Sequence, residues 1–316
     1  MFKKSAGLLA LTLFASACAG QSDTAQSTEA VTPLEPPSCT TPRQEIVTHQ
    51  YRELADSDFA LGSEVNDVSL DVHASPTAEG CPAIIWVHGG SWQAGDKATR
   101  LTTVKADHFI ASGHVFVSVN YRLAAEDNDT RWPDFGSDVA AATAWVRDNA
   151  DDLGVDAERI SLIGHSSGAH LVSIVGTNPD LLAEQDASTS DLACVISLDS
   201  VTHDLTDPPP WEVDIIDLAF PGQTALVEGS PTLQAEQHAS AESPDYLIVT
   251  RGRDERIASA ERLGATLTEA GGIAQVADLS PYDHSEVSTM LGIEGEQIVT
   301  PVVDDFLAGC SAPTSS

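Results

Sequence analysis

One stretch near the middle of the chain constrains the fold more than any other. The apolar residues 160–163 run directly into Gly164-His165-Ser166-Ser167-Gly168, which is followed by small and apolar residues. This order predicts a buried strand, a sharp turn with Ser166 at its top, and a helix. Glycine at positions 164 and 168 leaves space for the turn, because side chains there would crowd the serine. The same pattern also fits a purely structural strand-to-helix turn, so its meaning depends on its surroundings.

Strand-like and helix-like segments alternate along most of the chain. Besides the central unit, we expect strands at 68–72, 83–87, 115–119, 194–198, 246–250 and 273–277, and helices at 99–112, 134–151, 256–270 and 296–307. Continuous apolar runs are typical of central parallel strands, whereas 68–72 alternates and predicts a half-exposed strand. The sequence therefore predicts an α/β fold, a mostly parallel sheet with helices on both faces. An irregular insertion at 202–243 forms either part of a lid or substrate wall, or a surface excursion.

The first residues have the composition of an export signal. Residues 1–17 combine a basic start with a short apolar run that ends in small residues, which predicts a signal peptide rather than a membrane span. Residues 14–18 also resemble a bacterial lipobox, with Ala15 in place of the usual leucine, so Cys18 is either lipidated or follows an ordinary cleavage site. We expect a disordered tether over 18–40, a folded domain over 41–310 and a short tail at 311–316.

The charge balance limits the partners. Forty-eight acidic residues face 15 basic ones, a formal net charge of −33 that is spread along the chain. Such a field repels nucleic acid and anionic lipid headgroups. We therefore expect a small-molecule substrate, no nucleic acid, and membrane contact only through a lipid anchor. The protein would then be periplasmic, anchored to a membrane, or secreted.

Ser166 requires a base and a group that orients the base, because a serine hydroxyl is a weak nucleophile by itself. His284 lies in the loop after the last expected strand, and Asp254 lies in the loop after the strand at 246–250. Both positions fall at carboxyl ends of strands, where open α/β sheets build their sites. The sequence thus predicts a triad of Ser166, Asp254 and His284. Asp199, directly after the strand at 194–198, is the second choice for the acid.

Other side chains compete less well for these roles. Asp283 neighbours His284 in sequence, and adjacent side chains on an extended loop usually diverge. His165 and His170 flank the serine, where we expect them to pack or form hydrogen bonds, and His203 and His238 in the insertion can be surface polar groups.

A glycine-rich loop supplies the expected oxyanion hole. His88-Gly89-Gly90-Ser91-Trp92 directly follows the strand at 83–87, and glycine lets this backbone approach a substrate. The N–H groups of Gly90 and Ser91, with that of Ser167, are the predicted donors to the charge that develops on a carbonyl oxygen.

Five cysteines bear on the disulfides. With Cys18 set aside, Cys39, Cys81, Cys194 and Cys310 remain, and an even number in an exported protein favours disulfides. Cys194 begins an expected strand and Cys310 follows the last expected helix, so both tend to fall at the end of the sheet opposite the site. This favours Cys194–Cys310 and Cys39–Cys81, although three pairings are open. No spacing typical of a metal site appears, and we expect no metal.

Together, the motifs at 88–92, 120–123, 132–134 and 164–168 resemble the α/β-hydrolase carboxylesterases. Within them, the chain is similar to the His-Gly-Gly-x-Trp branch of arylformamidase-like and bacterial feruloyl- or acetyl-esterase-like proteins, over residues 65–307. The resemblance implies hydrolysis of esters without a cofactor, by Ser166, Asp254 and His284 and the donors Gly90, Ser91 and Ser167. The departures are Ser91, where a related branch has a third glycine, and Ser167, where alanine is more usual.

We therefore expect an exported serine hydrolase that cleaves carboxylic esters through an acyl-enzyme. The alternative within enzymes is an aryl-amide or formamide hydrolase like kynurenine formamidase. From another class, the chain could be a binding lipoprotein that keeps the fold without catalysis.

Overall fold

The computed structural model describes residues 39–42, 45–54 and 67–310. The predicted signal peptide, Cys18, most of the expected tether and the tail at 311–316 lie outside the described residues.

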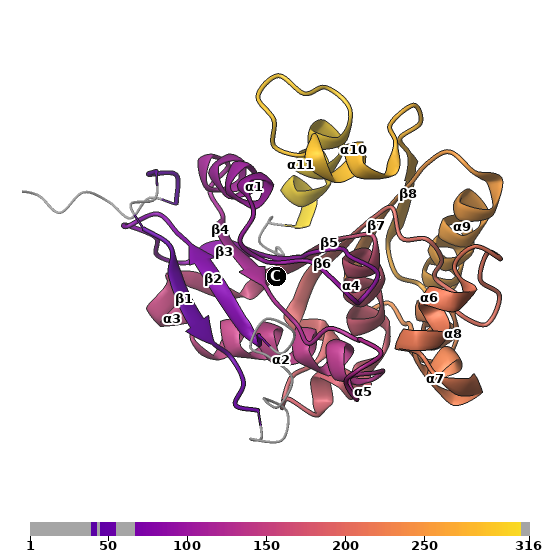
Figure 1. Cartoon of the computed structure of the whole chain (residues 1–316). Coiled ribbons are helices and arrows are strands. Elements are labelled where there is room, and N and C mark those ends of the chain that lie inside the picture. The colour runs from indigo at the N-terminus through magenta and orange to yellow at the C-terminus, as the bar shows by residue number, and fades with distance from the viewer. Residues whose placement is uncertain (1–38, 43–44, 55–66, 311–316) are drawn as a thin grey trace, which may run out of the picture. The chain divides into compact units, whose positions relative to one another are not determined.

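Within these ranges, eight strands form one sheet in the order β1-β2-β4-β3-β5-β6-β7-β8 (Figure 1). They are β1 (Val47–Gln50), β2 (Ser69–His73), β3 (Cys81–Val87), β4 (Val115–Val119), β5 (Val155–His165), β6 (Leu192–Leu198), β7 (Asp245–Thr250) and β8 (Ala274–Asp278). β2 pairs antiparallel with β1 and β4, and every other pairing is parallel. The predicted, mostly parallel sheet is confirmed; β1 is an edge strand that the sequence pattern did not indicate.

Helices cover both faces of the sheet. They are α1 (Arg100–Ala111), α2 (Asp134–Asp148), α3 (Ala150–Leu153), α4 (Ser167–Thr177), α5 (Pro179–Ala183), the 3₁₀ helix η2 (Thr189–Asp191), α6 (Val213–Ala219), α7 (Gly222–Glu228), α8 (Pro231–His238), α9 (Asp254–Glu269), α10 (His284–Thr289) and α11 (Val299–Cys310). In Figure 1, α1, α10 and α11 lie on one face of the sheet, and α2 and α4 lie on the other.

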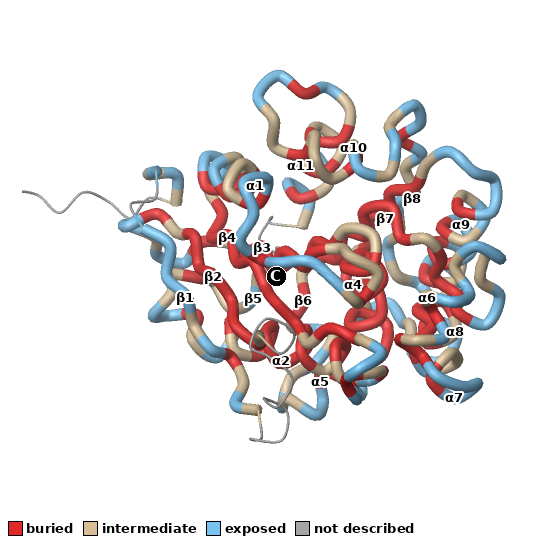
Figure 2. The backbone as a smooth tube through the Cα atoms, in the orientation of Figure 1, coloured by how far each residue is buried: buried red, intermediate tan, exposed pale blue. Residues whose placement is uncertain are grey.

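Alternation along the central strand β3 divides the core between the two faces. Ile84 and Trp86 belong to the apolar cluster under α1, α10 and α11, whereas Ile85 and Val87 belong to the cluster under α2, α4 and α9. This is the period of two expected when successive side chains of a strand point to opposite faces. A strand buried on both faces must be apolar throughout, and β3, like its neighbour β4, is accordingly buried along most of its length, whereas the edge strands β1 and β8 are not (Figure 2).

β2 is more buried than its sequence pattern predicted. All five of its residues are buried, including the charged Asp71. The carboxylate of Asp71 accepts a hydrogen bond from Thr48 at 2.6 Å and pairs with the ammonium of Lys97 at 3.1 Å. These partners offset the cost of burying the charge, which is why an alternating pattern does not make this strand half-exposed.

The insertion at 202–243 is not irregular, because it contains the three short helices α6, α7 and α8. Figure 1 shows them gathered beside α9, and α8 packs against both α4 and α9. Helix α4 begins directly after Ser166, so the insertion buttresses the helix that follows the candidate nucleophile.

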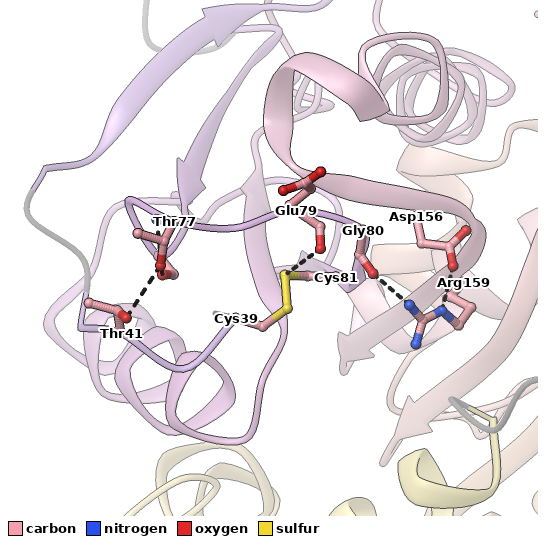
Figure 3. The surroundings of a disulfide bond; sticks show 9 residues. Cys39, Thr41, Thr77, Glu79, Gly80, Cys81, Asp156 and Arg159 are labelled. Atoms are coloured by element: carbon pink, nitrogen blue, oxygen red, sulfur yellow. Dashed lines mark hydrogen bonds and ion pairs between the residues drawn. A yellow bond between two sulfur atoms is a disulfide. The ribbon is translucent and has the colours of Figure 1, made fainter. Parts of the chain in front are cut away.

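Both expected disulfides are present. Cys39 bonds to Cys81, the first residue of β3, as Figure 3 shows, and Cys194 of β6 bonds to Cys310, the last residue of α11. Cys81 and Cys194 lie toward the amino ends of their strands, so both bonds fall at the end of the sheet away from Ser166, which is the location expected for Cys194–Cys310.

No helix in the described part of the chain has both the length and the apolar character that a membrane crossing requires.

Candidate active site

The turn that carries Ser166 has the geometry that its glycines predicted. Ser166 lies between β5 and α4 with φ 57° and ψ −121°, a backbone conformation that residues other than glycine rarely adopt. A Cβ at Gly164 would lie 2.2 Å from the carbonyl oxygen of Gly168, and one at Gly168 would lie 2.2 Å from that of Val87. Neither position has space for a side chain, so the tight packing of strand, turn and helix is what presents the serine.

His284 reaches Ser166 from the other end of the chain. Its Nε2 lies 2.9 Å from Oγ of Ser166, so the predicted pairing of serine and histidine is present in the structure. His284 is the first residue of α10 rather than a loop residue. Asp283 caps this helix, and its side chain accepts from the N–H of Glu286 while Glu286 accepts from the N–H of Asp283. This capping box fixes the turn from which the imidazole projects, and Asp283 has no role beside the ring.

The acid partner of His284 is Asp199, and the prediction of Asp254 is wrong. Oδ2 of Asp199 lies 2.6 Å from Nδ1 of His284. Asp254 is the exposed first residue of α9, and no hydrogen bond or ion pair joins its carboxylate to His284. β6 pairs directly with β5, so a residue just beyond β6 lies one strand from Ser166, whereas Asp254 follows β7, two strands away.

Asp199 is fully buried and ionised. Its Oδ2 accepts from Nε of Arg251 at 2.8 Å, and its Oδ1 accepts from Arg256 at 3.2 Å. Burial by itself would raise the pKa of Asp199, but the hydrogen bond from His284 and the charge of Arg256 hold it below its ordinary value. A carboxylate at 2.6 Å requires the proton on Nδ1 of His284, which leaves Nε2 free to accept the Ser166 proton. No sequence pattern indicated a role for either arginine.

The glycine-rich loop after β3 lies against the nucleophile. A Cβ at Gly89 would be 2.9 Å from Cβ of Ser166, and Gly90 has φ 134° with no space for a Cβ. Ser91 and Trp92 also have positive φ, 57° and 59°. Within the described residues, no hydrogen bond uses the backbone N–H of Gly90, Ser91 or Ser167. Their role as oxyanion donors stays a prediction.

Tyr121 and Arg122, in the motif that follows β4, make structural contacts. Asp138 is fully buried in α2 and accepts two hydrogen bonds from the side chain of Arg122, at 2.8 and 2.9 Å, and one from Arg52 at 2.6 Å. Tyr121 stacks on His88 with ring centroids 4.5 Å apart and donates to its carbonyl at 3.1 Å. The contacts of Tyr121 thus support His88, the first residue of the glycine-rich loop.

The remaining histidines do not belong to the chain of hydrogen bonds that joins Ser166, His284 and Asp199. His170 is buried, with Nε2 2.8 Å from the carbonyl of Gly229 in the insertion, and it packs as expected. His238 is exposed, as predicted. His203 is not a surface group: it is 1% exposed, with Nε2 3.1 Å from Oγ of Ser197. Within the described residues, no group of His, Cys, Asp and Glu could hold a metal ion.

A mostly parallel sheet at whose carboxyl edge Ser166, His284 and Asp199 come together defines an α/β-hydrolase with a serine-histidine-aspartate triad. The model of the BD-FAE family matches residues 70–255, more than half of the 316 residues, and the chain belongs to this family. The matched segment includes Ser166 and Asp199 and ends before His284.

Known esterases share the sequence and the fold. Esterase LipC of Mycobacterium tuberculosis is 28% identical over 69% of the chain and 54% of its own length, and Esterase LipQ of the same organism is 25% identical over 82% and 63%. The chain thus spans about half the length of the curated relatives it matches. Thermogutta terrifontis esterase 2, in a structure phosphonylated by sarin, superimposes with a TM-score of 0.66 at 22% identity, covering 84% of this chain and 96% of that one. The predicted fold and the resemblance to carboxylesterases are confirmed.

Proposed function

We propose that the protein is a serine esterase that hydrolyses carboxylic esters of small molecules through an acyl-enzyme. One observation carries this proposal: Oγ of Ser166, the imidazole of His284 and the carboxylate of Asp199 form a continuous chain of hydrogen bonds of 2.9 and 2.6 Å. Serine, base and orienting acid in this order are the elements that make a hydroxyl nucleophilic.

In the first half of the reaction, Oγ of Ser166 attacks the ester carbonyl carbon while Nε2 of His284 takes the hydroxyl proton. The negative charge of Asp199 stabilises the imidazolium that results. The carbonyl π electrons move to the oxygen, and we assign the N–H groups of Gly90, Ser91 and Ser167 to this oxyanion. Collapse of the tetrahedral intermediate breaks the bond to the alcohol oxygen, which leaves with the proton from His284.

In the second half, water attacks the acyl-serine and His284 takes one of its protons. The second tetrahedral intermediate collapses to release the carboxylic acid, and the proton on Nε2 returns to Oγ of Ser166. The chemistry uses only groups of the chain and water, so the proposed mechanism needs no cofactor.

The esterase names of the relatives support this reaction class, and the phosphonylated state named for the Thermogutta esterase suggests a matching reactivity. We therefore expect an organophosphorus probe to form a bond with Ser166.

We also propose export, with Cys18 as either a lipidated N-terminus or the first residue after ordinary cleavage. Two disulfides within one domain support an oxidising compartment, because cytosolic thiols are kept reduced. The intact mass of the protein, purified from a host that processes export signals, distinguishes the two N-termini by the mass of the added lipid. A cytoplasmic protein with its N-terminal Met retained would contradict export.

The test of the esterase function combines labelling with turnover. The wild-type chain should react with a fluorophosphonate probe and hydrolyse short p-nitrophenyl esters, and Ser166→Ala should lose both. Ser285→Ala is the matched control, because Ser285 is exposed beside His284 and its hydroxyl makes no side-chain hydrogen bond in the described part of the chain. Exclusive turnover of N-formylkynurenine would favour the formamide hydrolase, and no labelling or hydrolysis at all would favour the non-catalytic binding protein.

A further inference from the structure

His165 contacts His284 outside the hydrogen bonds that join Ser166, His284 and Asp199. Nε2 of His165 lies 2.7 Å from the backbone carbonyl oxygen of His284, and the two rings face each other with centroids 4.7 Å apart at 35°. The residue before the nucleophile therefore touches the residue that activates the nucleophile, although 119 positions separate them.

The chemistry of the contact defines the state of His165. A carbonyl oxygen can only accept, so Nε2 of His165 must carry a hydrogen and donate it. Burial, and next the neighbouring His284, lower the pKa of His165 to about 4. His165 is therefore a neutral imidazole with a free lone pair on Nδ1. A neutral ring matters, because a second imidazolium would repel the positive charge that His284 acquires during turnover.

His165 is also tied to the other parts of the site. It is the last residue of β5 and pairs in register with Leu198, the residue before Asp199. A Cβ at Gly89 would lie 3.3 Å from Nδ1 of His165, so the glycine-rich loop packs directly against this ring. His165 thus lies where the nucleophile turn, the acid strand and the glycine-rich loop meet the start of α10.

The bond from His165 gives the backbone of His284 a polar anchor beside the packing of Val287 in the core. α10 has only six residues, and its capping box satisfies the amide groups at its start without fixing the helix to the sheet. The His165 bond joins the carbonyl of the first residue of this helix to the end of β5. The imidazole of His284 hangs from the same residue, so this bond limits how far the ring can move from Ser166 and Asp199.

We propose that His165 is a positioning residue, which holds the backbone of His284 through its Nε2–H so that the imidazole spans Ser166 and Asp199. This inference rests on the proposed esterase function, but its structural part stands on its own. His165 occupies the variable position before the serine in the Gly-x-Ser-x-Gly turn, and in this proposal that position contacts the catalytic base.

Two substitutions separate the hydrogen bond from the packing. His165→Phe keeps a ring against His284 and removes the donor. His165→Gln loses the ring but places an amide N–H near the position of Nε2. We expect His165→Phe to lower kcat about 10- to 100-fold, the scale of a small misplacement of a reacting group, with KM within about twofold. His165→Gln should recover most of the lost kcat, as the donor and not the ring sets the position.

A spectroscopic measurement tests the same point without a substrate. The short bond between Nδ1 of His284 and Asp199 should give a far-downfield proton signal in the wild-type chain, which His165→Phe should broaden or remove and His165→Gln should restore. If the wild-type signal is present but no ester is cleaved, the proposed function fails while the positioning role is still tested by the signal in the variants.

Three results would overturn the inference. One is wild-type kcat together with an unchanged downfield signal in a folded His165→Phe protein. Another is a folded His165→Gln protein that is as impaired as His165→Phe in both readouts. The third needs no variant to fold: nitrogen chemical shifts of wild-type His165 that show a bare Nε2 would contradict the donor assignment, whereas a protonated Nε2 and a bare Nδ1 at neutral pH support it.

Discussion

Arg251 donates its Nε–H to Oδ2 of Asp199, the same oxygen that accepts Nδ1–H of His284. Arg256 holds the other oxygen, Oδ1, so the buried carboxylate is fixed in its rotation and one oxygen stays aligned with the imidazole. The acid of the site is therefore itself positioned by two residues from the segment after β7, the segment in which the sequence pattern had placed the acid.

Replacement of the acid tests this assignment most directly. Asp199→Asn should lower kcat on a p-nitrophenyl ester by about 10⁴-fold, because an amide there favours the wrong tautomer of His284. Asp254→Asn is the matched control and should stay within a few-fold of wild type, since Asp254 is exposed. Steady-state kinetics on both variants decides the matter. The reverse pattern, a silent Asp199→Asn and a dead Asp254→Asn, would restore the acid expected from sequence.

The glycine-rich loop should tolerate no side chain at Gly90. In Gly90→Ala, the new Cβ would lie 1.8 Å from the carbonyl oxygen of Ala94, so the backbone must move. We expect kcat to fall about 100- to 1000-fold, the usual cost of losing an oxyanion donor. Gly80→Ala is the control, because Gly80 also has positive φ but has open space around it. It should cost stability and leave kcat unchanged; equal losses in both variants would show that backbone strain alone explains the effect.

Buried histidines predict a loss of stability in acid. Burial, and next the electrostatic interaction with His170, lower the pKa of His203 to about 3, and burial lowers that of His170 to about 4. The unfolded chain, with histidine pKa values near 6.5, binds these protons first as the pH falls. The free energy of unfolding should thus decrease from about pH 6.5 downward, by up to about 1.4 kcal/mol per pH unit for each histidine.

His203→Gln removes one of the buried histidines that take up a proton when the chain unfolds in acid. Urea unfolding between pH 4 and pH 7 should therefore show a shallower pH dependence in this variant, by up to about 1.4 kcal/mol per unit. His238→Gln changes an exposed histidine and should keep the wild-type slope. An unchanged slope in His203→Gln would mean that His203 is accessible to protons in the folded state.

Removal of the buried carboxylate of Asp138 should destabilise the fold far more than removal of a partner from a surface pair. Asp138→Ala leaves Arg52 and Arg122 without their shared carboxylate, and we expect a loss of about 3–5 kcal/mol in urea unfolding. Asp156→Ala breaks the partly exposed pair with Arg159 and should cost less than about 1 kcal/mol. Similar losses for the two variants would contradict the structural role given to Asp138.

Each disulfide should stabilise the domain without taking part in the chemistry. The Cys194–Cys310 bond closes a loop of 116 residues and the Cys39–Cys81 bond one of 42. Loop-closure entropy makes each worth about 4–5 kcal/mol, the longer loop about 1 kcal/mol more. Replacing Cys194 and Cys310 together by serine should lower the unfolding temperature more than replacing Cys39 and Cys81 together by serine. In both variants kcat at 25 °C should stay near wild type. A loss of kcat in a still folded variant would connect the far end of the sheet to the site.

Ser166 and His284 could be predicted because their signals are local: a glycine-flanked turn after an apolar strand, and a histidine after the last strand. Asp199 could not be chosen with the same rule, since Asp254 also follows a strand. The choice depends on which strand lies beside β5 and on where Arg251 and Arg256 place their charges, and a sequence pattern specifies neither. The burial of Asp71 in β2 was missed for a similar reason, because Lys97 and Thr48 come from other segments.

The two disulfides have a further consequence for how the chain resists exopeptidases. Cys39 and Cys310 are near the two ends of the described chain, and each is bonded to an inner strand of the sheet. An exopeptidase that trims inward from either end meets a residue that it cannot release without first breaking a bond to the core. The segments beyond these cysteines can therefore be lost while the catalytic domain remains intact.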